Sequence, residues 1–146
     1  MASISHNVAE DLTALTIDIE SLNLTTSQYS AVSSAITNAY SLYCDFWLEL
    51  ASITPTAGGY AALYIIPSVD GTNYPVTNAK GAVSPGEAFF AAAMPFAAAG
   101  ASAQKTAAIS VPIPARNFKV IIANFSGTTW STGNTLKYSR HNLSVA

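Results

Sequence analysis

Two carboxylates and a tryptophan occupy alternate positions early in the sequence. Asp45, Trp47 and Glu49 are each separated by one residue, and Tyr43 comes two positions earlier. Glycosidases use paired carboxylic acids, and sugar rings stack on aromatic faces. In an extended strand, however, Asp45 and Glu49 are about 13 Å apart along the chain, at a rise of about 3.3 Å per residue. We therefore expect this set to form a structural or interaction surface rather than a catalytic pair.

Few other residues are candidates for catalysis or for binding a metal or a phosphate. Neither His6 nor His141 stands at a metal-ligand spacing from a second histidine, a cysteine or a carboxylate, so both are expected to be surface or terminal residues. The single cysteine, Cys44, excludes an internal disulfide framework and a thiolate zinc cluster. Gly58-Gly59 precedes an expected strand rather than a helix, so it lacks the helix N-terminus of a phosphate loop. We expect no enzyme, no catalytic residue, no metal and no cofactor.

Composition narrows the range of partners. The 146 residues are enough for one domain, and only 10% of them are charged while 50% are hydrophobic, against about 25% charged in typical soluble domains. The six Lys and Arg residues are scattered between Lys80 and Arg140, which argues against nucleic-acid binding. Proline, glycine and alanine interrupt the uncharged segments 51–69 and 88–104, so neither is expected to span a membrane. Residues 1–11 do not resemble a secretory signal, and we expect a soluble protein.

Alternation with a period of two is the dominant pattern along the chain. Ser41–Leu50 places its leucines, Cys44 and Phe46 on one side, which predicts a strand with one buried face. Ala107–Ile113 and Phe118–Phe125 also alternate, with Ile109 on the expected buried side of the first. The short link Pro114–Asn117 between these two segments predicts a hairpin.

The other segments complete an all-β pattern. Tyr60–Ile66 is continuously apolar, which predicts a central strand covered on both faces, and Thr135–Leu143 predicts a final strand near a sheet edge. Pro67–Ala82 is expected to be an exposed contact loop, with a turn at Asp70-Gly71. Residues 12–22 fit a helical face and a strand equally well, and we favour a strand. Residues 87–103 are interpreted as a strand followed by a loop.

Short strands joined by turn-rich segments predict an antiparallel β-sandwich of jelly-roll type over residues 12–146. Residues 1–11 lack periodicity and are expected to form an extended N-terminal arm, with a frayed terminus as the alternative.

The scarcity of charge directs attention to surfaces that meet other subunits, because aromatic residues are enriched and charges depleted in interface cores. The candidate interaction surfaces are an outward aromatic stripe, the contact loop, the Ala/Gly-rich segment 91–103 and a tyrosine of the last strand. A second sheet covering the stripe is the alternative, and the sequence leaves both open. The individual interface candidates are Tyr43, Trp47, Asp70, Asn73, Tyr74 and Tyr138.

Four segments resemble small virion proteins encoded in the head-gene regions of tailed bacteriophages. These segments are Tyr43–Leu50, Leu63–Tyr74, Val111–Val120 and Gly133–Asn142, and they follow the pattern in order from about residue 29 to residue 142. The resemblance implies a head decoration, or cement, protein without catalytic residues. It implies a position on the outer capsid surface of the virion after synthesis in the host cytoplasm.

The partners that this resemblance implies are neighbouring subunits of the major capsid protein, which the protein would clamp together, often as a homotrimer. A carbohydrate-binding or adhesion module on a phage particle is the alternative function, with Tyr43, Trp47 and Tyr74 as stacking platforms.

Overall fold

Strands make up nearly all of the regular structure in the computed structural model, which describes residues 4–6, 10–20, 24–38, 40–97 and 102–145. Only two short 3-10 helices, η1 (Asp18–Glu20) and η2 (Glu87–Phe89), occur within these residues. The strands are β1 (Ile4–His6), β2 (Thr13–Leu15), β3 (Gln28–Tyr29), β4 (Tyr43–Ile53), β5 (Tyr60–Pro67), β6 (Phe90–Pro95), β7 (Ser102–Pro112), β8 (Phe118–Phe125), β9 (Thr135–His141) and β10 (Leu143–Val145).

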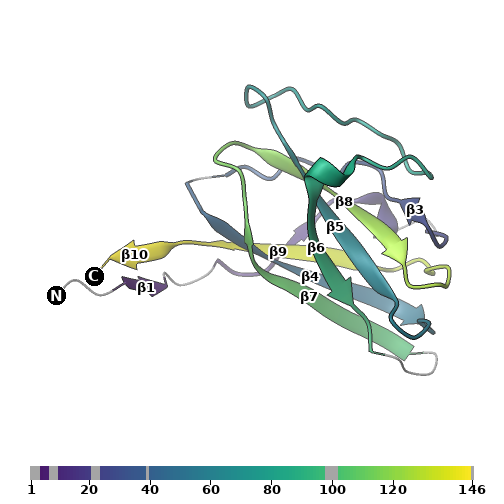
Figure 1. The fold of residues 1–146 in the computed structure, drawn as a ribbon. Coiled ribbons are helices and arrows are strands. Elements are labelled where there is room, and N and C mark those ends of the chain that lie inside the picture. Colours follow the sequence, from purple (N-terminus) through teal and green to yellow (C-terminus); the bar gives the residue numbers. More distant parts are fainter. Residues whose placement is uncertain (1–3, 7–9, 21–23, 39, 98–101, 146) are drawn as a thin grey trace.

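Two antiparallel four-stranded sheets pack face to face (Figure 1). One sheet has the order β2-β9-β4-β7 and is called the β4 sheet below; the other has the order β3-β8-β5-β6 and is called the β5 sheet. The chain passes repeatedly from one sheet to the other, and only β5 and β6 are consecutive strands of one sheet. This is the connectivity of a jelly roll, which confirms the predicted fold class.

The hydrophobic core fills the space between the sheets. The predicted alternation of β4 is confirmed, because Cys44, Phe46, Leu48 and Leu50 are all buried in this core. Leu42, which was expected to join them, is 54% exposed because it precedes the first residue of the strand.

The strand β5 is buried on both faces, as its continuous apolar sequence predicted. It lies between β8 and β6, and Leu63 points to the core between the sheets while Tyr64 and Ile66 face the other way. The segment that follows β5 covers this outer face, and Tyr74 and Val76 pack there. Figure 1 shows this segment passing over the β5 sheet as an irregular loop.

The predicted hairpin between residues 107–113 and 118–125 is wrong. β7 pairs with β4, whereas β8 pairs with β5, so the two strands lie in different sheets. The link Pro114–Asn117 therefore crosses from one sheet to the other. A short link shows that two strands are close in space, but the pairing partners are set by residues distant in sequence.

The buried side of β7 also differs from the prediction. Ala108 is buried and Ile109 is 67% exposed, whereas alternation back from Val111 had placed Ile109 inside. Val111 pairs with Cys44 and Ala108 with Phe46, so β7 contains one extra residue at this point. Such a bulge reverses the sidedness of the strand beyond it.

The first and last strands of the sandwich, β2 and β9, lie side by side in the β4 sheet. Residues 135–141 form β9 near a sheet edge, as predicted, and the short β2 pairs with β9 on the side away from β4 and is itself the edge strand. Within the described residues 12–20, Thr13–Leu15 form a strand and η1 follows, while residues 21 and 22 lie outside the described residues. Residues 87–103 begin with η2 and continue as the predicted strand, β6, while residues 98–101 lie outside the described residues.

The two ends of the described chain pair with each other. Ile4 of β1 lies opposite Val145 of β10 in an antiparallel two-stranded ribbon. Figure 1 shows this ribbon extending beyond one end of the sandwich. Residues 1–3 and 7–9 of the predicted N-terminal arm lie outside the described residues.

Candidate interaction surface

The outer faces of the two sheets differ in how they are covered. The loop between β5 and η2 packs against the outer face of the β5 sheet and forms a second apolar cluster there. On the outer face of the β4 sheet, Tyr43, Asp45, Trp47 and Glu49 alternate with buried residues and are partly exposed. No second apolar cluster covers this face among the described residues. It is called the open face below.

Tyr74 lies on the covered side of the sandwich. It packs against the outer cluster of the β5 sheet, and Nζ of Lys119 lies 4.5 Å from the centre of its ring in a cation-π contact. Tyr43 and Trp47 belong to the open face of the other sheet. The three aromatic side chains named as stacking platforms for a sugar are therefore divided between opposite sides of the molecule.

Asp70 and Asn73 hold the turn after β5. Oδ1 of Asp70 accepts hydrogen bonds from the backbone N–H groups of Thr72 at 2.9 Å and of Asn73 at 2.7 Å. These bonds hold the pKa of Asp70 well below its usual range, because they stabilise the ionised carboxylate. Gly71 supplies the positive φ of 103° that the predicted turn needs. The geometry therefore gives both residues a role within the loop itself.

Trp47 is held in one orientation on the open face. Its indole Nε1–H donates a 2.7 Å hydrogen bond to Oε1 of Glu49, and Nζ of Lys137 lies 3.5 Å from the same oxygen. The bond from Trp47 is the main cause of the lowered pKa of Glu49, and the positive charges of Lys137 and Lys105 lower it further. A fixed aromatic ring binds at a lower entropic cost than a mobile one.

Asp45 and His141 come together although 96 positions separate them in the sequence. Nε2 of His141 lies 3.2 Å from Oδ1 of Asp45, and the imidazole stacks on the ring of Tyr43 at a centroid distance of 5.6 Å. His141 was expected to be a surface or terminal residue, and at 8% exposure it does not lie on the surface. The pairing of Tyr43 with His141 across β4 and β9 explains the contact, and local spacing carries no signal of it.

Ser110 completes a Ser–His–Asp cluster, but the cluster does not have the geometry of a catalytic triad. Oγ of Ser110 lies 3.5 Å from Nε2 of His141, which is the same nitrogen that approaches Asp45. In a triad the serine and the carboxylate contact opposite nitrogens of the imidazole, so that a proton can leave the serine while the carboxylate orients the ring. The arrangement found here cross-links β4, β7 and β9.

Tyr138 differs from the other interface candidates. It lies opposite Phe46 in the pairing of β4 and β9, and it packs against the core between the sheets. It is therefore placed to support the core rather than to face a partner across the open face.

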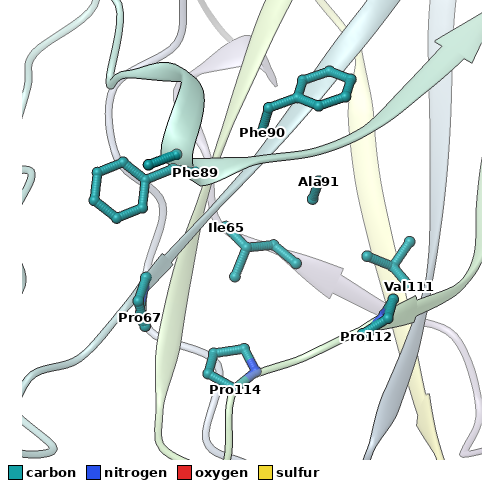
Figure 2. A pocket seen from close by; sticks show the side chains of 9 residues that line it. Ile65, Pro67, Phe89, Phe90, Ala91, Val111, Pro112 and Pro114 are labelled. Carbon is teal, nitrogen blue, oxygen red and sulfur yellow. The ribbon is translucent and has the colours of Figure 1, made fainter.

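The surface of the described residues includes two hollows with mainly apolar linings. One, of about 270 Å³, lies on the open face and is lined in part by Leu12, Trp47 and Ile109. The other, of about 410 Å³, lies where the edge strands β6 and β7 approach each other, and Figure 2 shows the phenylalanine and proline side chains that line it. No ionisable residue lines this second hollow, which gives it no acid or base for chemistry. Its lining includes Ile65, Pro67, Phe89, Phe90, Pro112 and Pro114.

The described residues contain no group of three or more His, Cys, Asp or Glu side chains placed to hold a metal ion. No helix in this part of the chain is long and apolar enough to cross a membrane. Comparisons of the chain with protein-family models, curated proteins and solved structures found no match.

Proposed function

We propose that the chain is a structural virion protein that decorates and stabilises the capsid of a tailed bacteriophage. In this role it binds the outer capsid surface as a homotrimer and bridges neighbouring subunits of the major capsid protein. The observation that carries the proposal is the open face of the β4 sheet, where Leu12, Trp47 and Ile109 surround a hollow and two of the three side chains are more than half exposed.

Low charge and capsid symmetry support this role. Only 10% of the residues are charged, so little desolvation of charge opposes the burial of a large part of the surface. A capsid repeats the same junction many times, and an oligomer that contacts several junctions at once gains affinity from the high effective concentration of its second and third contacts. Interfaces that are individually modest thereby become stable.

The jelly-roll fold is compatible with capsid decoration, but it does not distinguish this function from glycan binding. Jelly rolls occur in viral capsid domains and also in lectins, and a fold by itself does not determine function. The choice therefore depends on the open face and on the four segments that resemble phage virion proteins.

Binding to capsids and the oligomeric state test the proposal directly. The purified chain is mixed with expanded heads assembled from the major capsid protein of the genome that encodes it, and bound protein is separated by sedimentation. We expect saturable binding, a rise in the temperature at which the heads break open, and a trimer by light scattering. A chain that is monomeric and neither binds nor stabilises these heads would contradict the proposal.

A glycan-binding module is the second candidate function, and one observation favours it. Trp47 is fixed by Glu49 beside the carboxyl group of Asp45, and an aromatic ring next to a hydrogen-bond acceptor suits a sugar. A glycan array distinguishes the two functions. Glycan binding that disappears in Trp47→Ala supports adhesion, whereas binding to heads with no glycan bound supports decoration.

A further inference from the structure

The hollow on the open face combines apolar sides with a carboxyl group. Ile109 of β7 and Leu12, which precedes β2, line the hollow from the two edges of the sheet and are 67% and 52% exposed. Trp47 and Asp45 line it from the central strand β4. A ligand that enters here contacts aliphatic and aromatic side chains together with a polar group.

Only one of the two carboxylate oxygens of Asp45 has a hydrogen-bond partner among the described residues. Its Oδ1 accepts a 2.6 Å hydrogen bond from the backbone N–H of Ser110 and lies 3.2 Å from Nε2 of His141. Both contacts end on Oδ1, and among the described residues no donor bonds to Oδ2. The Asp45 side chain is 26% exposed, so its carboxyl group can meet a donor from outside.

The other charged group of the hollow is already paired. Both carboxylate oxygens of Glu10 accept hydrogen bonds from the guanidinium of Arg140, at 2.8 and 2.9 Å. No lysine or arginine is among the residues that line the hollow. Within the described part of the chain, Asp45 is thus the lining carboxylate without a lysine or arginine partner, and its contact with a basic group is the one to His141.

We propose that this hollow receives a lysine or arginine side chain of the capsid protein on which the chain docks. This inference rests on the proposed function and names its docking site. The aliphatic stem of the incoming side chain packs between Leu12 and Ile109 beside the ring of Trp47, and its cationic head donates to Oδ2 of Asp45. Long basic side chains bury their methylene groups in this way, and an aromatic ring beside the cation adds a cation-π contact.

An apolar partner would fit the hollow less well. Docking removes water from the hollow, and a carboxylate that loses water without gaining a donor or a cation costs several kcal/mol. A basic side chain covers the same apolar surface and also supplies the missing donor. Charge complementarity therefore selects a cation-bearing partner.

A matched pair of charge-removing substitutions tests the inference. Asp45→Asn removes the charge but retains an oxygen for the Ser110 N–H, and Glu87→Gln removes the charge of an exposed carboxylate that does not line the hollow. We expect Asp45→Asn to weaken binding to heads by about tenfold or more, with Glu87→Gln close to wild type. Ile109→Ser provides a second variant that leaves the carboxylate intact and is expected to weaken binding as well. Circular dichroism confirms that each variant is folded.

Salt dependence gives a further readout of the same contact. The affinity of the wild type for heads is expected to fall more steeply with ionic strength than the affinity of Asp45→Asn, because the variant lacks one screened charge pair. Equal binding and equal salt dependence in the wild type and Asp45→Asn would overturn the inference and leave the proposed function standing.

A probe that needs no capsid separates the two proposals. Acetyl-arginine amide is titrated into the isotopically labelled chain, with acetyl-citrulline amide as the uncharged control and N-acetylglucosamine as the sugar control. We expect the arginine derivative alone to shift the NMR signals of Trp47 and Ile109, and Asp45→Asn to abolish the shift. If the wild type fails to bind heads but shows this response, the proposed function is wrong and the cation site stands. No response to arginine, or a response to the sugar only, would overturn the cation site.

Discussion

The backbone N–H of Ser110 donates a 2.6 Å hydrogen bond to Oδ1 of Asp45 across the bulge between β7 and β4. Ser110 adopts a positive φ of 53°, which serine rarely does. The bond anchors the extra residue of β7, and it also holds the carboxyl group that lines the hollow on the open face. One local irregularity of the sheet therefore exposes Ile109 and orients Asp45.

The backbone at Ser110 makes a first prediction about stability. Ser110→Val is expected to lower the free energy of unfolding by about 1–2 kcal/mol, because a β-branched residue is strained at positive φ. Ser110→Gly is the matched control, and we expect it to retain the stability of the wild type, since glycine adopts this conformation without strain. Urea denaturation measures both, and equal losses in the two variants would contradict the role of the backbone conformation.

The buried amide of Asn124 makes a second prediction. Its Nδ2 donates to the carbonyl oxygens of Leu24 and Thr128, and its Oδ1 accepts from the backbone N–H of Ser126. Asn124→Ala is expected to cost at least about 2 kcal/mol of unfolding free energy, because it leaves several buried polar groups without partners. Asn78→Ala is the control, and its expected change is within about 0.5 kcal/mol. Similar effects in thermal denaturation of the two variants would argue against the buried network.

The thiol of Cys44 makes a prediction about reactivity. Cys44 is fully buried in the core, and burial raises the pKa of the thiol to about 12, so little thiolate forms near neutral pH. We expect negligible alkylation by iodoacetamide at pH 8 in the folded protein and full alkylation in denaturant. The signal is unambiguous because the chain has one cysteine. Rapid modification under native conditions, measured by mass spectrometry, would contradict the burial of β4.

The turn at Asp70 makes a prediction about acid stability. The pKa of its carboxyl group is lowered from the ordinary value of 3.8, chiefly by the backbone N–H of Asn73 and then by that of Thr72. A lowered pKa in the folded state contributes stability above the ordinary pKa, and this contribution is lost as the pH falls through the folded value. The stability advantage of the wild type over Asp70→Asn is therefore expected to be greatest above about pH 4 and to shrink in stronger acid. Chemical denaturation across this range measures it, and a difference that does not vary with pH would contradict the turn hydrogen bonds.

The sequence alone predicted the strands whose burial pattern can be seen in the order of their apolar and polar residues. The alternation of β4 and the continuous apolar run of β5 indicate a strand with one buried face and a strand with two, and both interpretations are confirmed. The outward set at Tyr43, Trp47 and Glu49 followed from the same alternation. Period-two burial is a property of consecutive residues, so it is visible without knowledge of the fold.

Pairing between distant strands was decided only by the tertiary structure. The short link Pro114–Asn117 was expected to be a hairpin turn, yet it crosses between the sheets. The bulge at Ser110 turns Ile109 outward. The contact between Asp45 and His141 depends on the antiparallel register of β4 and β9.

The open face likewise depends partly on local sequence and partly on contacts between distant segments. Composition and alternation determined that the chain forms a charge-poor β-sandwich with aromatic residues pointing outward. Which outward face remains open was decided when the loop after β5 packed Tyr74 over one sheet and left Trp47 on the other. Burial of one sheet face by a loop depends on contacts between segments far apart in the chain, and these contacts are absent from any local pattern of residues.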